Sequence, residues 1–119
     1  MSRCSQCDHT LEVTELRCPA CAVTLSGTFA SPRLARLAGD QQRLIEQVIL
    51  AGGNLKEVAR DSQISYPTFR KRLDAVIEAL TKMRHDDDQR AQHLLGDVEA
   101  GRIAPEAAAR QIREMNGGS

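Results

Sequence analysis

Four cysteines are the residues of this 119-residue chain whose spacing points most directly to chemistry. They form two Cys-x-x-Cys pairs, Cys4 with Cys7 and Cys18 with Cys21, separated by ten residues. Each pair can place two thiolates on one metal ion, and two pairs complete a tetrahedral site with four sulfur ligands. The spacing therefore predicts one structural zinc ion in a zinc ribbon over residues 1–26.

Other interpretations of these cysteines stay open. An iron site of the rubredoxin type, a thiol redox switch and free cysteines would use the same residues. Four sulfur ligands leave no open coordination position, so a catalytic zinc site is not expected. His9 could substitute as a ligand, although the four cysteines already fill the site. The usual glycine after each pair is missing, and Asp8 and Ala22 stand in its place, which predicts strained turns.

A basic cluster, Arg70-Lys71-Arg72, marks a second stretch with a candidate role. Residues 66–73 carry no acidic side chain, whereas the whole chain is neutral, with 16 basic and 16 acidic residues. Any attraction to nucleic acid must therefore be local. Clustered Lys and Arg side chains are typical of phosphate contacts. A solvated helix face is the alternative interpretation.

Two helices joined by a tight turn would position this cluster. Asn54 and Glu57 give a capping-box pattern for the first helix, and Ser65 is a favourable N-cap for the second. Pro67 falls in the first turn of the second helix, where its missing N–H costs no hydrogen bond. The pattern predicts a helix-turn-helix. Its expected DNA contacts are Ser65, Tyr66, Thr68, Arg70, Lys71 and Arg72.

A preceding helix over residues 41–51, capped by Asp40 and ended by Gly52-Gly53, would support the helix-turn-helix. The three helices occupy roughly residues 40–82, and we place the whole DNA-binding unit at residues 31–84. The expected core residues are Leu44, Val48, Leu55, Val58, Ile64, Phe69, Leu73 and Ile77.

The apolar pattern lapses over residues 84–90, which predicts a solvated linker or a helix that runs on exposed to water. Residues 91–115 then predict a helical hairpin, broken at Gly101 and resumed at Pro105. We assign residues 85–119 to this C-terminal hairpin. It could dock a protein partner, form an oligomer, or brace the helix-turn-helix.

Composition places these modules in a mostly α-helical protein, since aromatic residues make up 3% of the chain. No apolar run approaches the ~20 residues that span a bilayer, and the first residues lack the apolar core of a signal peptide. We therefore expect a cytoplasmic protein with no membrane partner, and in that reducing compartment paired cysteines favour metal binding over disulfides. An enzyme is not expected, because the sequence offers no nucleophile–base pairing and no phosphate-cradling glycine loop.

The cysteine pairs, residues 53–60 and residues 64–70 together resemble a bacterial family of unknown function. That family joins an N-terminal zinc ribbon to a helix-turn-helix and a short C-terminal helical tail. Residues 95–107 look like an oligomerisation motif appended to many bacterial proteins. The resemblance implies a transcription regulator.

The helix-turn-helix is also similar to that of the Fis-type DNA-bending proteins. In those proteins a Gly-Asn precedes the first helix and a Thr-x-Arg-x-x-Leu pattern fills the second. The matching residues here are Gly53, Asn54, Thr68, Arg70 and Leu73. The chain departs from the usual pattern in the turn, where Gln63 replaces a glycine.

These patterns predict a DNA-binding transcription regulator. A homodimer is expected, with double-stranded DNA read at two half-sites about one helical turn, ~34 Å, apart. The alternative is a protein–protein adaptor of the transcription machinery or of another regulator. In an adaptor the helix-turn-helix would be a scaffold whose basic face is only solvated.

Overall fold

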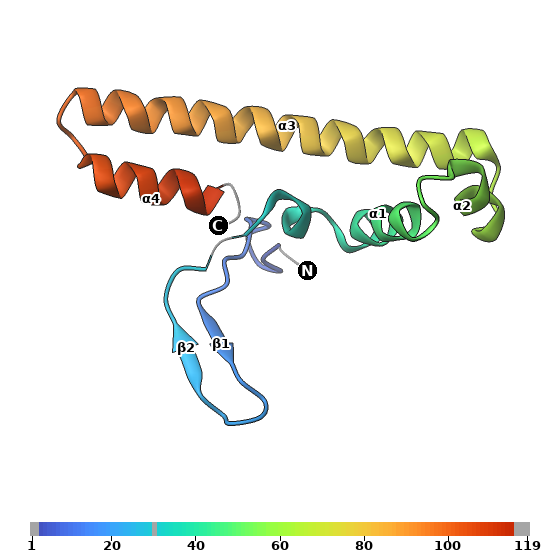
Figure 1. The fold of residues 1–119 in the computed structure, drawn as a ribbon, viewed down its shortest axis with the longest axis horizontal. Coiled ribbons are helices and arrows are strands. Elements are labelled where there is room, and N and C mark those ends of the chain that lie inside the picture. Colours follow the sequence, from blue (N-terminus) through green and yellow to red (C-terminus); the bar gives the residue numbers. More distant parts are fainter. Residues whose placement is uncertain (1–2, 30, 116–119) are drawn as a thin grey trace. The chain divides into compact units, whose positions relative to one another are not determined.

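The computed structural model describes residues 3–29 and 31–115 (Figure 1). Its elements in chain order are β1 (Glu15–Arg17), β2 (Thr24–Ser26), the 3-10 helix η1 (Arg33–Arg36), α1 (Gly39–Leu50), α2 (Leu55–Asp61), α3 (Tyr66–Glu99) and α4 (Pro105–Met115). The protein is mostly α-helical with a small two-stranded N-terminal ribbon, as the sequence predicts. The chain forms two compact units. Residues 37–86 make one unit, and residues 1–36 with 87–119 make the other.

The unit of residues 37–86 holds α1, α2 and the first part of α3. Its core consists of the buried side chains of Val58, Ala59 and Phe69. The partly buried side chains packed against them include five more of the predicted core residues: Leu44, Val48, Leu55, Ile64 and Leu73.

The prediction of Ile77 as a core residue was wrong. Its side chain is 47% exposed, whereas that of Val76 is only 2% exposed. Phe69, Leu73 and Val76 follow the i, i+4, i+7 spacing of a single helix face. Ile77 lies about 100° further round the helix, at the edge of that face.

Side-chain caps start α2 and α3 where the sequence predicts them. The backbone N–H of Glu57 donates to Asn54 Oδ1 at 3.2 Å, and the N–H of Thr68 donates to Ser65 Oγ at 3.3 Å. The predicted Asp40 cap of α1 was wrong, because α1 begins at Gly39 without a side-chain cap. Asp40 lies in the first turn instead, where its negative charge still favours the helix N-terminus.

The ends of α1, α2 and α3 share one backbone motif. A residue with positive φ follows each helix: Gly52 at 65°, Gln63 at 59° and Gly101 at 76°. After α2, the N–H of Gln63 donates to the carbonyl of Arg60 and the N–H of Ile64 to that of Ala59. This pair of bonds is a Schellman motif, which normally places glycine at the residue with positive φ.

The helix α3 continues without a break through residues 84–90. The predicted solvated linker is therefore wrong and the continuing helix is observed, although Asp87 on it is buried rather than exposed to water. The chain then turns at Gly101 and begins α4 at Pro105, as predicted for the hairpin. None of the helices in the described part of the chain combines the length and apolar character needed to cross a bilayer.

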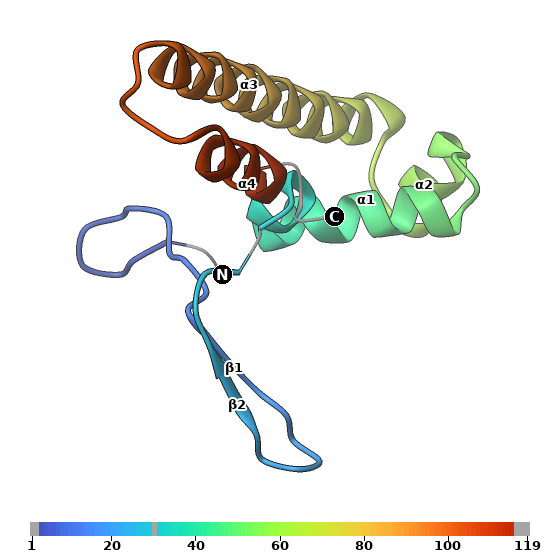
Figure 2. The ribbon, with the colours of Figure 1, turned by 60° about the vertical axis from the view of Figure 1, so that its left-hand side comes forward.

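The N-terminal ribbon is a hairpin of β1 and β2 (Figure 2). The strands pair antiparallel, with Leu16 opposite Leu25 at the centre. Within residues 3–28, which the structure describes, only Cys4 is partly buried and the other residues are exposed. The ribbon therefore has no apolar core of its own.

Candidate metal knuckles and nucleic-acid interface

The first cysteine pair lies in a tight loop closed by two backbone hydrogen bonds. The N–H of Cys4 donates to the carbonyl of His9 at 2.8 Å, and the N–H of Asp8 donates to the carbonyl of Cys4 at 2.9 Å. The bond from Asp8 joins the residue after the pair to its first cysteine. The loop thereby holds Cys4 and Cys7 at neighbouring positions.

The second cysteine pair lies in a loop with the same hydrogen bonds. The N–H of Cys18 donates to the carbonyl of Val23 at 2.8 Å, and the N–H of Ala22 donates to the carbonyl of Cys18 at 2.8 Å. The sequence offsets of four and five residues are those of the first loop. We call these two loops the knuckles.

Both knuckles contain a residue in the left-handed backbone region. Asp8 has a φ of 60° and Ala22 a φ of 63°. Among the described residues, Gln63 is the only other non-glycine residue with positive φ. Side chains in this region cost roughly 1–2 kcal/mol per residue, so the strain predicted from the missing glycines is present.

The knuckles favour the thiolate form of one cysteine each. The N–H of Gln6 donates to Cys4 Sγ at 3.4 Å, and backbone hydrogen bonds from Gln6 and Cys7 lower the pKa of the Cys4 thiol. The pKa of Cys18 is lowered chiefly by backbone hydrogen bonds from Cys21 and Ala20. Thiolates are the metal-binding form of cysteine.

The structure brings the four cysteines together as two pairs. Within its described residues, no group of three or more His, Cys, Asp or Glu side chains is placed to hold a metal ion. The donor set nevertheless fits zinc, because two equal knuckles offer four sulfur ligands. Cys4, Cys7, Cys18 and Cys21 would hold the ion, which would supply a cross-link that the ribbon lacks.

The three basic residues of α3 point in different directions. At about 100° per residue, Lys71 lies on the side of α3 opposite the buried Phe69. Arg70 lies on one flank, where its Nε contacts Asp74 Oδ1 at 3.2 Å. Arg72 lies on the other flank. Only Lys71 therefore occupies the centre of the outward face.

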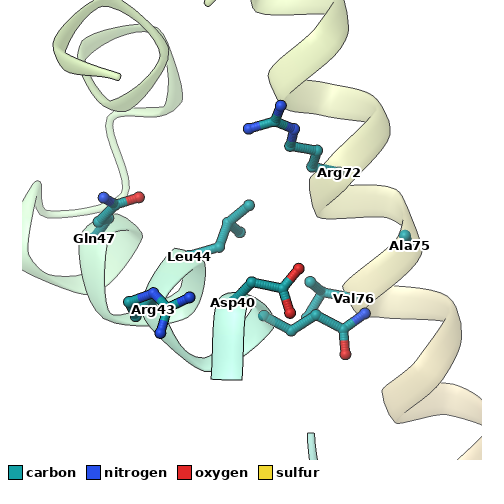
Figure 3. Close-up of a pocket in the computed structure, with 8 residues that line it drawn as sticks. Asp40, Arg43, Leu44, Gln47, Arg72, Ala75 and Val76 are labelled. Carbon is teal, nitrogen blue, oxygen red and sulfur yellow. The ribbon is translucent and has the colours of Figure 1, made fainter. Parts of the chain in front are cut away.

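Arg72 lines a pocket between α1 and α3, inside the unit of residues 37–86 (Figure 3). The pocket has a volume of about 540 Å³. Its other lining residues are Asp40, Gln41, Arg43, Leu44, Gln47, Ala75 and Val76. Arg72 thus lies on the side of α3 that borders α1, and its side chain is still exposed to water.

The other predicted contact residues lie at the start of α3. Ser65 caps the helix, and its hydroxyl donates to Thr68 Oγ1 at 2.8 Å. Tyr66 and Thr68 are both exposed. Sequence reasoning did not assign Lys56 and Arg60, which are exposed on α2. Their i, i+4 spacing on the face away from Val58 is the signal that could have found them.

Two family models match the chain. Residues 4–35 match the DUF2089 zinc ribbon, and residues 37–83 match the helix-turn-helix domain of unknown function DUF2089. The chain belongs to the DUF2089 family. The first match contains all four cysteines and the second contains the start of α3, which confirms the predicted ribbon and helix-turn-helix. Neither a curated protein nor a solved structure gives a significant match.

In this DUF2089 protein, an ion cluster joins Arg33 and Arg36, which precede the helix-turn-helix match, to Asp87, which follows it. Arg33 Nη1 donates to Asp87 Oδ2 at 3.0 Å, and Arg36 Nη2 donates to the same oxygen at 2.6 Å. The Asp87 side chain is only 4% exposed. Burial by itself would raise the pKa of Asp87, but hydrogen bonds and charge from Arg36 and Arg33 leave that pKa below its ordinary value.

This cluster was not predicted from the sequence, because the run of apolar residues lapses over residues 84–90. The signal was available in the spacing of α3. Its buried and partly buried face runs in steps of three and four residues: Phe69, Leu73, Val76, Leu80, Met83, Asp87, Ala91, Leu94 and Val98. Asp87 occupies one position of that otherwise apolar stripe, so the stripe does not end at Met83.

Proposed function

We propose that this protein is a DNA-binding transcription regulator that uses its helix-turn-helix together with a structural zinc ribbon. The observation that carries the proposal is the position of Lys71. It lies opposite the buried Phe69 on the capped helix that follows the turn, and this is the helix that enters the major groove in helix-turn-helix proteins. The proposed role is one of binding in the cytoplasm, without a catalytic step.

The basic residues would have different tasks in such a regulator. Lys71, Lys56 and Arg60 would contact phosphates, which position the protein without reading sequence. Arg70 would read a guanine edge, because a guanidinium can donate two parallel hydrogen bonds to O6 and N7. Tyr66 and Thr68 at the start of α3 would contact base edges or the DNA backbone. Arg72 faces its own pocket and would contribute least.

A homodimer is part of the proposal. One helix-turn-helix of this size buries little surface on DNA, and dimers of such units read half-sites about 34 Å apart. The C-terminal part of α3, from residue 84 on, and α4 lie outside the family matches, and this part of the hairpin could join two copies or bind a protein partner.

The direct test is fluorescence anisotropy with pooled genomic DNA fragments over a salt series. The zinc-loaded parent should bind tightly at low salt and lose affinity steeply as salt rises, because phosphate contacts release counterions. Lys71→Ala should weaken binding at every salt concentration. Lys82→Ala, which removes an exposed lysine further along α3, serves as the matched control and should bind as the parent does.

One observation favours a second function, the protein–protein adaptor. Asp74 and Glu78 lie three and seven residues after Lys71 and are exposed on the same side of α3. Their carboxylates would face DNA phosphates unfavourably, whereas a mixed-charge face suits a protein partner. Absence of DNA binding by folded, zinc-loaded protein at low salt would contradict the DNA-binding proposal and favour the adaptor.

A further inference from the structure

The 3-10 helix η1 contacts α3 through ion pairs, and none of its own residues is buried. Leu34 is 53% exposed and Ala35 is also exposed, and η1 contains no buried residue. Its two arginines, Arg33 and Arg36, donate hydrogen bonds to Asp87 on α3. The contact of η1 with α3 is therefore ionic and does not bury an apolar side chain of η1.

Asp87 sits where the stripe of α3 would otherwise place an apolar residue. A buried carboxylate loses its hydration, and that cost is offset only when its charge is paired and its oxygens are hydrogen-bonded. Both oxygens of Asp87 accept bonds from the two arginines. The pairing is nevertheless incomplete, because Arg36 Nε is buried without a hydrogen-bond partner in the described structure.

A buried ion cluster is not the arrangement that would make the fold most stable. Replacing a buried ion cluster with apolar residues of similar volume is often neutral or stabilising. A buried charge instead fixes one register, because any shift along the helix would leave it unpaired. It also makes the attachment depend on a few specific bonds that break together.

The adjoining residue is anchored separately. Leu37 is 1% exposed, and its carbonyl accepts a hydrogen bond from Gln42 Nε2 at 2.9 Å. Leu37 belongs to the unit of residues 37–86. Leu37 would therefore keep its own contacts, and the core around Phe69 would stay intact, when Arg33 and Arg36 release Asp87.

We propose that Arg33, Arg36 and Asp87 form a releasable ion latch. Closed, the latch holds residues 33–36, and the zinc ribbon that precedes them, to the C-terminal part of α3 in the same unit. Open, it frees the ribbon while the helix-turn-helix unit stays folded. The latch is a conformational device independent of the proposed DNA binding, since its residues are not among the proposed DNA contacts.

Trypsin provides a direct readout, because it cleaves after the two arginines that the latch holds. The full-length, zinc-loaded chain would be treated briefly with trypsin, and cleavage after Arg33 and Arg36 followed by mass spectrometry. Asp87→Asn removes the charge with little change of shape. Loss of a charge-assisted hydrogen bond should speed these two cleavages by about tenfold or more. Asp88→Asn, at the exposed neighbouring carboxylate, should cleave as the parent does.

Three results would contradict the proposed latch. Equal cleavage of the parent and Asp87→Asn would show that other contacts hold the segment. Rapid cleavage throughout α2 and α3 in Asp87→Asn would show that Asp87 supports the whole fold. A second variant, Asp87→Leu, covers the case in which Asp87→Asn misfolds. Leucine puts an apolar residue into the stripe of α3, so this variant should fold. Its helix-turn-helix unit should unfold at the same temperature as that of the parent, and Arg33 and Arg36 should still be exposed to trypsin. Protection of both sites in this folded variant would equally contradict the proposal.

Discussion

Asp8 and Ala22 hold the same position in two loops of the same backbone conformation, with φ angles of 60° and 63°. In both loops this residue donates its N–H to the carbonyl of the first cysteine of the pair. Each knuckle is thus formed by local hydrogen bonds alone. One zinc ion held by all four cysteines would join the two knuckles, a task that no apolar core performs among the described residues of this ribbon.

Metal content should follow the cysteines. We expect about one zinc ion per chain in the parent, bound by four sulfur ligands, and loss of that ion in Cys18→Ser. Elemental analysis by mass spectrometry would measure it. Ser5→Ala, inside the first knuckle but without a ligand atom, should keep its zinc. A chelator should disorder residues 3–26 while the amide signals of α2 and α3 persist. Full zinc content in Cys18→Ser would contradict this site.

A glycine at position 63 should stabilise the protein. Gln63 has the φ of 59° that glycine adopts without strain, so Gln63→Gly should raise the free energy of unfolding by about 1 kcal/mol. Urea denaturation followed by circular dichroism would measure it. The same exchange inside α3, Gln89→Gly, should instead lower it by about 1 kcal/mol. A destabilised Gln63→Gly would show that its side chain makes an unrecognised contact.

Val76 and Ile77 are neighbours on α3 but differ in burial, so their truncation to alanine should cost different amounts of stability. Val76→Ala should cost about 2 kcal/mol, because it removes fully buried methyl groups and leaves a cavity. Ile77→Ala should cost less than about 1 kcal/mol, since much of that side chain already meets water. Denaturant unfolding of both variants would test the order. The reverse order would place Ile77 in the core after all.

Stability should depend on pH through Asp87. Its pKa is lower in the folded protein than the ordinary value, owing to Arg36 and Arg33 despite burial. The carboxylate therefore adds stability above its unfolded-state pKa, and this stability is lost as the pH falls through the folded-state pKa. The difference in unfolding free energy between the parent and Asp87→Asn should be full at pH 7 and shrink below about pH 5. A difference that is constant with pH would rule out this linkage.

The outward and inward basic residues of α3 should differ in their salt dependence. Lys71→Ala should reduce the slope of log affinity against log salt by about one, as expected for a phosphate contact. Arg72→Ala should leave that slope nearly unchanged, because Arg72 faces the pocket beside α1. Anisotropy titrations of the two variants on one DNA duplex would compare them. Equal slope changes would mean that Arg72 leaves its pocket on binding.

The parts of the fold that the sequence predicts are those controlled by local chemistry. Asn54 and Ser65 cap their helices through bonds that span three residues, and Gly101 stops α3 by its own backbone freedom. The spacing of the cysteines likewise identified two equal loops. These features need no knowledge of distant residues.

The wrong and missing predictions concern residues whose burial or pairing depends on residues far away in the sequence. Val76 and Ile77 both fit an apolar helix pattern, and the choice between them depends on how α3 faces its neighbours. Asp87 looks like one of three solvated carboxylates until Arg33 and Arg36, more than fifty residues earlier, are placed beside it. Whether the two knuckles bind one ion together depends on the metal ion itself, which is not part of the sequence.

The pairing of Arg70 with Asp74 bears on the kinetics of the proposed DNA search. An arginine whose charge is largely cancelled by a carboxylate 3.2 Å away adds little to the long-range field that speeds encounter. The same guanidinium can still form short, directional bonds once it exchanges that carboxylate for a guanine edge. Random stretches of DNA, which offer only phosphate charge, would then hold the protein weakly and release it quickly. Residence time, rather than the rate of arrival, would distinguish the correct site.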